Sequence, residues 1–344
     1  MNIQKINRVL TANNFPKYRR KQILDGIFKQ FASSWGEITN LPKEIIGILE
    51  KEAPISSLEI AQDFEALPKD AAKILFKAKD GNFVETVLMK HADKGASGEG
   101  GRKTVCISSQ AGCAMNCAFC ATGQGGFFRN LTAEEILDQV LHFCRILKKQ
   151  GEKMNNIVFM GMGEPFNNYD NVIAAIKLFN GAEYLNIGMR HISVSTCGIV
   201  PGIEKFAEEN IQANLAISLH APTDEIRSRL MPINVAFPIK KLFAAVDFYI
   251  EKTNRKVMLE YLLIDGINDS DDCAQKLIAL MRKKLCHVNL IKYHSTSAAL
   301  RASSQIRQTR FFDILKKAGI SCTFRRSFGE DIKAACGQLS GKER

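Results

Sequence analysis

Three cysteines in one short stretch constrain this chain more than any other feature of its sequence. Cys113, Cys117 and Cys120 follow a C-x3-C-x2-C spacing, directly after the apolar-then-polar run 105–110. Three thiolates this close together can bind one soft metal centre, because the short spacers form a loop that wraps around it. They do not fill the coordination of a structural zinc or of a four-iron cluster, so one position stays open for another ligand. We expect the chemistry at that open position.

Two alternatives to a cluster are coincidence and a zinc site completed by a distant histidine or by one of the other seven cysteines. However, the spacing of the three cysteines, followed by Ala121-Thr122-Gly123, resembles that of the radical S-adenosylmethionine (SAM) superfamily. Members of that superfamily use three cysteines to hold a 4Fe-4S cluster and leave the fourth iron for the amino and carboxylate groups of SAM. The resemblance implies such a cluster here and does not indicate a substrate.

The chain length and composition are typical of a globular protein. With 344 residues the chain can bury a large core, and length alone suggests one large domain and a smaller one. There is no run of about 18 apolar residues, and the segment 1–5 lacks the apolar core of a signal peptide. We therefore expect a soluble, cytoplasmic protein without a membrane segment. Ten cysteines in that setting favour a metal cluster and thiol chemistry over a disulfide framework.

Positive charge is concentrated near the end of the chain. The net charge is +11, and residues 301–344 contain ten Lys and Arg against four Asp and Glu, a local net of +6. A polyanion is the natural partner of such a segment. A basic surface that only improves solubility is the alternative.

The first part of the chain is predicted to be a small helical domain, residues 1–78, that contacts RNA. Residues 17–28 have apolar positions at helical spacing and a basic face, and residues 70–76 give another short helical pattern. A solvated basic face is the alternative interpretation. Residues 82–89 alternate like a strand, and the Gly- and Lys-rich stretch 94–103 is predicted to be a loop.

From residue 105 onward, short apolar runs alternate with helical windows, which predicts a parallel sheet. Periodicity alone fits a doubly wound sheet as well as a partial (β/α)6 barrel. The cysteines favour the partial barrel of radical-SAM enzymes, here a core of residues 79–298 followed by a basic C-terminal segment, 299–344. Strands are expected at 105–108, 156–160, 191–195, 214–219, 257–263 and 288–292, and helices at 132–149, 170–180, 202–209, 239–252 and 271–284, with a last helix at 305–318 and a strand at 322–325.

Polar residues follow the predicted strands at the edge where parallel α/β folds place their active sites. The second strand leads into Gly161-Met162-Gly163-Glu164, where glycine lets the backbone approach a ligand and Glu164 can accept hydrogen bonds from an ammonium. The third ends at Ser195 and the fourth at Ser218-Leu219-His220. Each motif alone fits an ordinary turn. Together with the cysteine loop they predict a site for a polar cofactor.

Motifs from end to end of the chain resemble the RlmN/Cfr family of radical-SAM RNA adenosine methyltransferases. The last motif, Ala334-Ala335-Cys336-Gly337-Gln338-Leu339, is highly specific beside the cluster motif. The other matching stretches are 84–87, 106–110, 113–120, 129–132, 161–164, 218–222 and 231–234.

This resemblance implies a mechanism for the thiols. C2 of adenine is neither nucleophilic nor acidic, so the family uses a carbon radical that the cofactor supplies. The resemblance implies that Cys336 takes a methyl group from one SAM and that a second SAM, bound at the cluster, supplies the radical. Cys106 then releases the product, and Glu85 occupies the position of the family's proton acceptor. In an isolated, oxidised sample, Cys106 and Cys336 can instead form a disulfide.

The family's SAM contacts map onto seven positions, one of which departs from the pattern. The family commonly has an asparagine where this chain has His294, and imidazole can donate one hydrogen bond as an amide does. We therefore expect SAM binding to survive this change. The implied SAM contacts are Gly163, Glu164, Ser195, Ser218, Leu219, His220 and His294.

The implied substrates are 23S ribosomal RNA, at an adenosine of the peptidyl transferase centre, and tRNA, at the adenosine after the anticodon. The target base has to leave its stack, with the basic C-terminal segment and the N-terminal helices gripping the RNA backbone. A flavodoxin or ferredoxin is the expected electron donor, and we expect a monomer. C2 is preferred as the commoner activity, although Cfr-type methylation of C8 in 23S rRNA, which confers antibiotic resistance, is the alternative.

Two other functional classes fit the sequence less well. A non-catalytic RNA-binding protein with a structural zinc would not need Cys336. A radical-SAM enzyme that acts on a small molecule or peptide would have no use for the basic C-terminal segment. Neither class accounts for Cys106 and Cys336 together.

Overall fold

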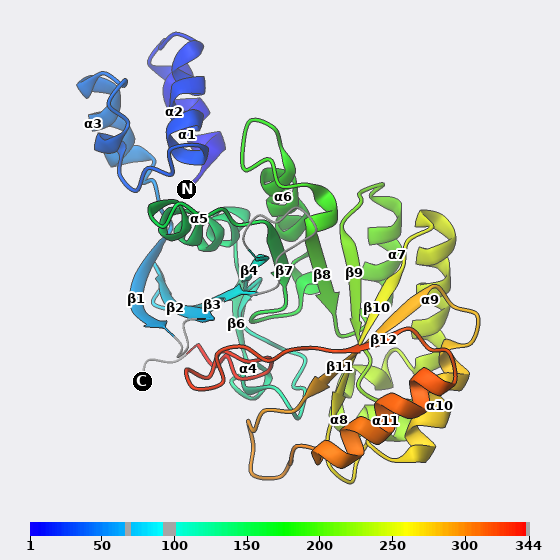
Figure 1. Ribbon diagram of the computed structural model, residues 1–344. Helices are drawn as coiled ribbons and strands as arrows, with labels where there is room; N and C mark the ends of the chain where they lie inside the picture. The colour runs from blue at the N-terminus through cyan, green and yellow to red at the C-terminus, as the bar shows by residue number, and fades with distance from the viewer. Residues whose placement is uncertain (66–69, 92–100, 342–344) are drawn as a thin grey trace.

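A single large sheet organises the part of the chain that the computed structural model describes, residues 1–65, 70–91 and 101–341 (Figure 1). Its strand order is β1-β2-β3-β4-β7-β8-β9-β10-β11-β12, with β1 and β12 at the two ends. The strands are β1 (Leu58–Glu65), β2 (Ala71–Ala78), β3 (Phe83–Lys90), β4 (Lys103–Cys106), β7 (Asn156–Phe159), β8 (Ile192–Thr196), β9 (Asn214–Ser218), β10 (Val257–Leu263), β11 (Cys286–Lys292) and β12 (Cys322–Phe324).

The six strands predicted after residue 105 are confirmed as neighbouring parallel strands, from β4 to β11. Their bounds agree within two residues, and β4 ends at Cys106 rather than at residue 108. The predicted strand 322–325 is β12, which continues the parallel order beside β11. In the described residues the order is linear, so the barrel is partial, as predicted.

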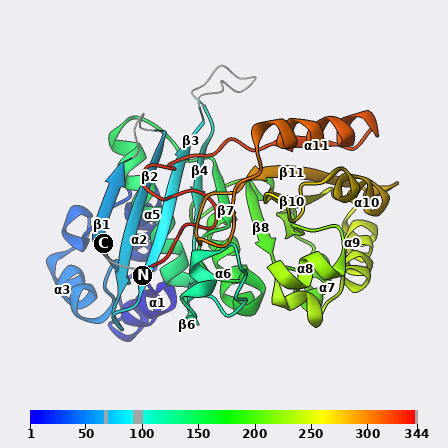
Figure 2. The same ribbon diagram turned by 90° about the horizontal axis from the view of Figure 1, so that it is seen from below.

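The helices lie along the outside of these strands (Figures 1 and 2). The predicted helix 132–149 is α5, which begins with a capping box between Thr132 and Glu135. The short α8, capped by Thr223, was not predicted. The helices of this part are α5 (Ala133–Lys149), α6 (Tyr169–Asn180), α7 (Val200–Glu208), α8 (Asp224–Leu230), α9 (Ile239–Thr253), α10 (Asp271–Met281) and α11 (Gln305–Lys317), with short 3-10 turns η2 (Pro165–Asn168), η3 (Met189–His191) and η4 (Pro232–Val235).

The helical prediction for residues 1–78 is correct only for its first part. Three helices and a 3-10 turn fill it: α1 (Ile3–Ala12), α2 (Tyr18–Phe28), η1 (Trp35–Glu37) and α3 (Lys43–Glu52). They pack on α5, where the amino group of Met1 donates to Asp138 at 3.0 Å and Arg145 donates to the carbonyl of Phe31 at 3.2 Å.

The helix expected at 70–76 is wrong, because Ala71–Ala78 forms the strand β2 between β1 and β3. Ile74, Leu75 and Phe76 are consecutive and all buried, so side chains on both faces of the strand are covered. A surface helix would leave one of its faces in water. Both β1 and β2 belong to the large sheet, beside β3. The domain boundary at residue 78 stays a prediction.

The predicted loop 94–103 lies mostly outside the described residues, and Lys103 begins β4. In the described ranges, no helix combines the length and the apolar character that crossing a membrane requires.

Candidate functional site

A small hairpin frames the loop of three cysteines. Strands β5 (Gln110–Gly112) and β6 (Phe127–Asn130) pair antiparallel, and the loop between them contains the short helix α4 (Ala121–Gln124). The N–H of Cys113 donates to the carbonyl of Gly126 at 2.7 Å, which closes the base of the loop. Gly112 has φ +73°, and a Cβ on it would lie 2.1 Å from that carbonyl oxygen. Only glycine allows this closure.

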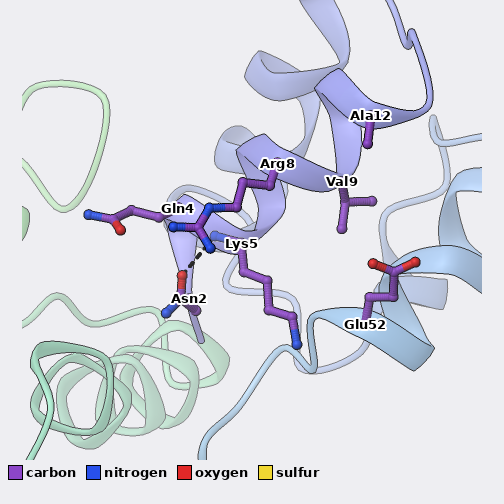
Figure 3. Close-up of a pocket in the computed structure, with 7 residues that line it drawn as sticks. All are labelled: Asn2, Gln4, Lys5, Arg8, Val9, Ala12 and Glu52. Carbon is purple, nitrogen blue, oxygen red and sulfur yellow. Dashed lines mark hydrogen bonds between the residues drawn. The ribbon is translucent and has the colours of Figure 1, made fainter.

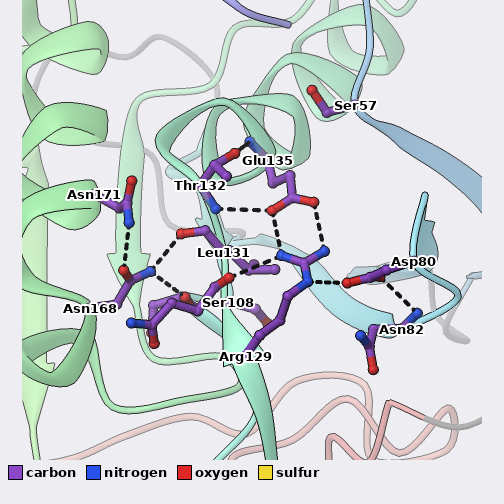
Figure 4. Close-up of polar contacts among 12 residues, drawn as sticks. Ser57, Asp80, Asn82, Ser108, Arg129, Leu131, Thr132, Glu135, Asn168 and Asn171 are labelled. Carbon is purple, nitrogen blue, oxygen red and sulfur yellow. Dashed lines mark hydrogen bonds and ion pairs between the residues drawn. The ribbon is translucent and has the colours of Figure 1, made fainter.

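Arg129 ties the hairpin to two other elements (Figure 4). Its guanidinium makes two hydrogen bonds of 2.8 Å to Glu135 in α5 and a further ion pair with Asp80, in the turn between β2 and β3. These carboxylates raise the pKa of Arg129, and the guanidinium lowers the pKa of Asp80. The bidentate geometry fixes the orientation of the hairpin, and with it that of the cysteine loop.

The cysteine thiols lie in apolar surroundings. Cys113 and Cys117 are buried, and Cys120 is partly exposed. Burial raises the pKa of Cys113 to about 12 and also raises that of Cys117. The charge of Cys120 adds to both shifts, and the charge of Cys113 adds to that of Cys117. Such thiols become thiolates when a bound cation supplies the compensating charge. The donor set therefore fits a soft metal centre.

Among the described residues, no three His, Cys, Asp or Glu side chains converge closely enough to hold one metal ion. In an iron–sulfur cluster each cysteine binds a different iron, so the three thiols need not meet at one point.

The motif Gly161–Glu164 packs against the strand that leads into the cysteine loop. Gly163 has φ +97°, and a Cβ on it would lie 2.5 Å from the Cβ of Gln110. The N–H of Glu164 donates to Oε1 of Gln110 at 2.8 Å. Its own carboxylate accepts N–H bonds from Phe166 at 3.0 Å and Cys197 at 2.7 Å, and burial raises its pKa. These N–H bonds, with side-chain hydrogen bonds from Cys197 and Thr196, oppose that rise in pKa and fix the orientation of the carboxylate.

His220 stands at the end of β9 in a left-handed conformation, with φ +54°. Its Nδ1 accepts the N–H of Leu262 at 3.0 Å, which assigns the proton to Nε2. Burial lowers the pKa of His220 to about 3, so the ring is neutral at physiological pH. The ring packs edge-on against Phe119, with 4.7 Å between centroids. His220 therefore lies beside the cysteine loop, and Ser218 and Leu219 precede it directly.

Sequence reasoning missed Arg227, a fully buried residue in α8. Its guanidinium donates to the carbonyls of Cys197 at 2.6 Å, Ser218 at 3.2 Å and Leu219 at 3.2 Å. A further bond of 2.9 Å reaches Oδ1 of Asn234, which belongs to the motif 231–234. Arg227 thus fixes the carboxyl ends of β8 and β9. The motif pointed to this region, but nothing in the residue pattern indicates which carbonyls the arginine reaches.

We expect Arg227→Met to lower the free energy of unfolding by about 3 kcal/mol or more, because it leaves several buried carbonyls without donors. Urea denaturation of the metal-free protein measures this loss. Arg229→Met is the matched control, since Arg229 is an exposed residue of the same helix. Equal unfolding midpoints for the two variants would contradict the role of Arg227.

Cys106 and Cys336 lie together although 230 positions separate them in the chain. Cys106 is the last residue of β4 and is buried, whereas Cys336 is exposed. Burial raises the pKa of Cys106 to about 12, and the charge of Cys336 is the next largest cause. Burial also raises the pKa of Cys336. The positive charge of Arg325 opposes the rise in pKa at both thiols, and Arg325 forms an ion pair with Glu260 at 3.3 Å. Both cysteines are free thiols in this structure.

Residues 325–341, here called the Cys336 segment, bring Cys336 to the cysteine loop. After β12 the segment runs back across the strand ends toward β2 and β3, coloured red in Figures 1 and 2. The N–H of Ala121 donates to the carbonyl of Gly337 at 2.8 Å, and the hydroxyl of Thr122 donates to the carbonyl of Leu339 at 2.6 Å. Cys336 therefore sits next to the residues that directly follow Cys120.

Glu85 and His294 both contact the Cys336 segment. Oε2 of Glu85 accepts the N–H groups of Ser340 at 2.6 Å and Gly341 at 2.9 Å. Nε2 of His294 lies 2.8 Å from the hydroxyl of Ser327. The pKa of His294 is lowered by burial, an effect that Glu330 opposes. Contact between His294 and SAM stays a prediction, because the structure shows the ring in contact with Ser327.

A separate pocket lies between α1 and α3, away from the cysteine loop (Figures 1 and 3). Its lining includes the basic residues Lys5 and Arg8 and the acidic residue Glu52. None of the predicted site residues lines it.

Comparison with known proteins gives consistent results. Residues 107–277 match the model of the radical SAM superfamily. The chain is 41% identical to the "Probable dual-specificity RNA methyltransferase RlmN" of Clostridium tetani, over 98% of this chain and 94% of that protein. It is also 41% identical to the "Ribosomal RNA large subunit methyltransferase N" of Nitrosopumilus maritimus, over 98% and 96%. The crystal structure of a radical SAM methyltransferase from Sphaerobacter thermophilus superposes with a TM-score of 0.94 at 42% identity, covering 99% of this chain and 98% of that one.

Proposed function

Because this chain belongs to the RlmN family of radical-SAM RNA methyltransferases, we propose that it methylates C2 of an adenosine in 23S ribosomal RNA through a methylated Cys336. The same site is proposed to act on the adenosine that follows the anticodon in tRNA. The names of the relatives support the RNA class, and the name of the Clostridium tetani protein includes "dual-specificity".

The position of Cys336 is the observation that carries this proposal. The Cys336 segment holds it against α4, directly after the cysteine loop, and close to Cys106. A structural zinc site or a cofactor site for a small molecule gives no reason to bring a second pair of free thiols to this place. A methyl carrier needs to reach both the cofactor and the second thiol.

A 4Fe-4S cluster held by Cys113, Cys117 and Cys120, with SAM on its open iron, would supply the carbon radical that an unreactive ring carbon requires. The residues around the cluster would bind SAM and hold the strand ends in position. Gly163 and Glu164 would offer close backbone approach and an acceptor for the ammonium of SAM, and Ser195, Ser218 and His220 would offer polar groups. Arg227 would hold the ends of the two strands in place.

Cys336 acts first in the proposed sequence. Its thiolate attacks the methyl group of one SAM, forming a new S–C bond while S-adenosylhomocysteine leaves. Arg325 favours this thiolate electrostatically. The radical that the cofactor would supply would take one hydrogen atom from the S-methyl group. The remaining carbon would then bond to C2 of adenine, and one electron would return to the cluster as the ring proton leaves. The RNA is then covalently bound to Cys336.

Cys106 and Glu85 then release the product. Glu85 accepts the proton from the ring carbon, and the thiolate of Cys106 attacks Sγ of Cys336. This attack forms an S–S bond and breaks the S–C bond, whose electron pair returns to the carbon, which becomes a methyl group after protonation. Two external reductants reset the protein. Flavodoxin or ferredoxin would donate electrons to the cluster, and a thiol would reduce the disulfide.

RNA binding is proposed to use the basic C-terminal segment and the N-terminal helices. Residues 301–344 have a net charge of +6, and Lys5 and Arg8 stand on α1. Phosphate contacts release counterions, so the RNA affinity should fall steeply with salt.

We expect Cys106→Ala to trap the covalent RNA–protein adduct, because no thiol then attacks Cys336. Denaturing gel electrophoresis of a labelled RNA fragment, followed by nuclease digestion and peptide mass spectrometry, measures the adduct. Cys144→Ala is the matched control, since Cys144 is a buried thiol in α5. Sustained turnover by Cys106→Ala would contradict the release role.

Mass spectrometry of nucleosides tests the proposed function. Anaerobically reconstituted protein is incubated with SAM, a reductant and either 23S RNA or tRNA. The proposal predicts 2-methyladenosine in the product. Formation of 8-methyladenosine would assign the protein to the C8 branch, and no modified adenosine would overturn the proposed substrate.

A further inference from the structure

Lys73 is buried in a place where charged side chains are rare. The residue has no exposed surface, whereas Lys77, four positions later in the same strand β2, is exposed. A buried ammonium is costly unless a partner compensates its charge. Glu85 is one such partner: its Oε1 lies 2.8 Å from Nζ of Lys73, and its side chain is 2% exposed.

The strand register explains how these two residues meet. In the antiparallel pair of β2 and β3, Leu75 is opposite Glu85 and Lys73 is opposite Val87. Side chains alternate between the two faces of a strand, so Lys73 and Glu85 lie on the same face as diagonal neighbours. The pairing of β2 and β3 therefore brings the two charges together. Sequence reasoning did not predict this pairing.

The ion pair also touches the chain on both sides of Cys336. Nζ of Lys73 donates to the carbonyl of Lys333 at 3.4 Å, three positions before Cys336. Oε2 of Glu85 accepts the N–H groups of Ser340 and Gly341, four and five positions after it. The pair thus holds the two ends of the loop that presents Cys336.

Several described elements contribute groups near the Glu85 carboxylate. Strand β2 contributes the ammonium of Lys73, and the Cys336 segment contributes uncharged peptide N–H groups. Strand β4 contributes the titratable thiol of Cys106, which neighbours Val87 of β3, and the loop after β7 contributes the uncharged Met162. Among the described residues, the positive charge that pairs with the carboxylate therefore comes from Lys73 in β2.

We propose that Lys73 is a positioning residue for product release: its buried ammonium holds the Glu85 carboxylate in place, and its bond to Lys333 fixes the Cys336 segment. This inference rests on the proposed function, in which Glu85 accepts the proton of the adenine ring. Without the ammonium, the buried carboxylate loses the charge that compensates it and the contact that orients it. A misplaced carboxylate accepts the ring proton slowly, so the covalent RNA adduct persists.

The experiment compares Lys73→Met with Lys77→Met, which makes the same change in an exposed residue of the same strand. Wild type and variants are loaded with iron and methylated at Cys336, then mixed with labelled RNA at neutral pH. Denaturing gels follow the formation and decay of the adduct. Each decay rate is divided by the wild-type rate.

The proposal predicts normal methylation of Cys336 in Lys73→Met and, at neutral pH, adduct decay slower than wild type by about tenfold or more. Glu85→Gln also decays slowly, because an amide does not accept the ring proton, and Lys77→Met decays like wild type. Lys73→Arg, which keeps a cation beside Glu85, decays faster than Lys73→Met at neutral pH.

Decay of the Lys73→Met adduct at the wild-type rate would overturn the proposal. Equal decay of the Lys73→Arg and Lys73→Met adducts would also overturn it, as would loss of Cys336 methylation in both Lys73 variants, since either result means a purely structural role. A wild-type protein that forms neither adduct nor methylated adenosine would refute the proposed function itself, which separates the two failures.

Discussion

Replacing Cys336 by alanine is expected to lower RNA methylation by on the order of 10³-fold or more, the scale of loss when a covalent nucleophile is removed. The methyl carrier has no substitute, because Cys106 is buried at the end of β4 and the attachment to α4 places residue 336 at the cysteine loop. The measurement is methylated adenosine per protein in the reconstituted assay. Iron content and the visible absorption of the cluster should match wild type, because Cys336 is not among the cluster cysteines.

Cys322→Ala provides a matched control for this variant. Cys322 is a buried cysteine of β12, with no proposed role in the chemistry, and it lies in the same part of the chain. Methylation should persist in this control. Activity of Cys336→Ala within about tenfold of wild type would contradict a covalent role for Cys336.

Replacing Cys113, Cys117 and Cys120 together by alanine is the second change with a large expected effect. We expect loss of the iron, of the cluster absorption and of all RNA methylation, because no other donor set in the described residues replaces the three thiols. Iron analysis and the nucleoside assay measure the two losses.

A neighbouring cysteine distinguishes a cluster from a zinc site. Cys197 is buried, and its charge couples to those of Cys117 and Cys113, so it is the cysteine that a four-thiol zinc site would use. A cluster with one iron open to SAM does not need it. Cys197→Ala should therefore keep the iron and the cluster absorption. Metal loss in Cys197→Ala, or zinc in place of iron in the wild type, would contradict the radical-SAM assignment of the site.

The parallel part of the fold was predictable because each strand and helix has a local pattern. The run Val257–Leu263 is apolar and ends where β10 ends, and Thr132 and Glu135 mark the start of α5. The sheet order from β4 to β11 then follows from the short alternating connections. The cysteine spacing was equally local, which is why the cluster loop could be found without a structure.

What the residue pattern did not reveal depends on contacts between distant segments. Residues 70–76 were predicted as a helix because their apolar positions fit helical spacing, and only the pairing with β3 makes them a strand. Lys73 is indistinguishable from a solvated lysine in the sequence, and its burial depends on Glu85 and on the Cys336 segment. Arg227 likewise shows its function only when the ends of β8 and β9 lie beside it.

The proximity of Cys106 and Cys336 also depends on contacts between distant segments of the chain. The family resemblance named Cys106 and Cys336 as a pair, but no local pattern in either segment predicts that residues 325–341 cross the strand ends. The SAM contact that the resemblance suggests for His294 stays a prediction, and in the structure the ring lies against Ser327. Long-range packing decides such questions, and propensity does not.

The fate of the methyl carbon distinguishes a methyl carrier from direct transfer. The protein is methylated at Cys336 with SAM that carries a ¹³C methyl group, freed of that SAM, and then mixed with RNA and unlabelled SAM for a single turnover. Peptide and nucleoside mass spectrometry locate the label. The methyl-carrier mechanism predicts that ¹³C leaves Cys336 and appears in the methyladenosine of the first turnover. Label that stays on Cys336 while the RNA gains an unlabelled methyl group would contradict it.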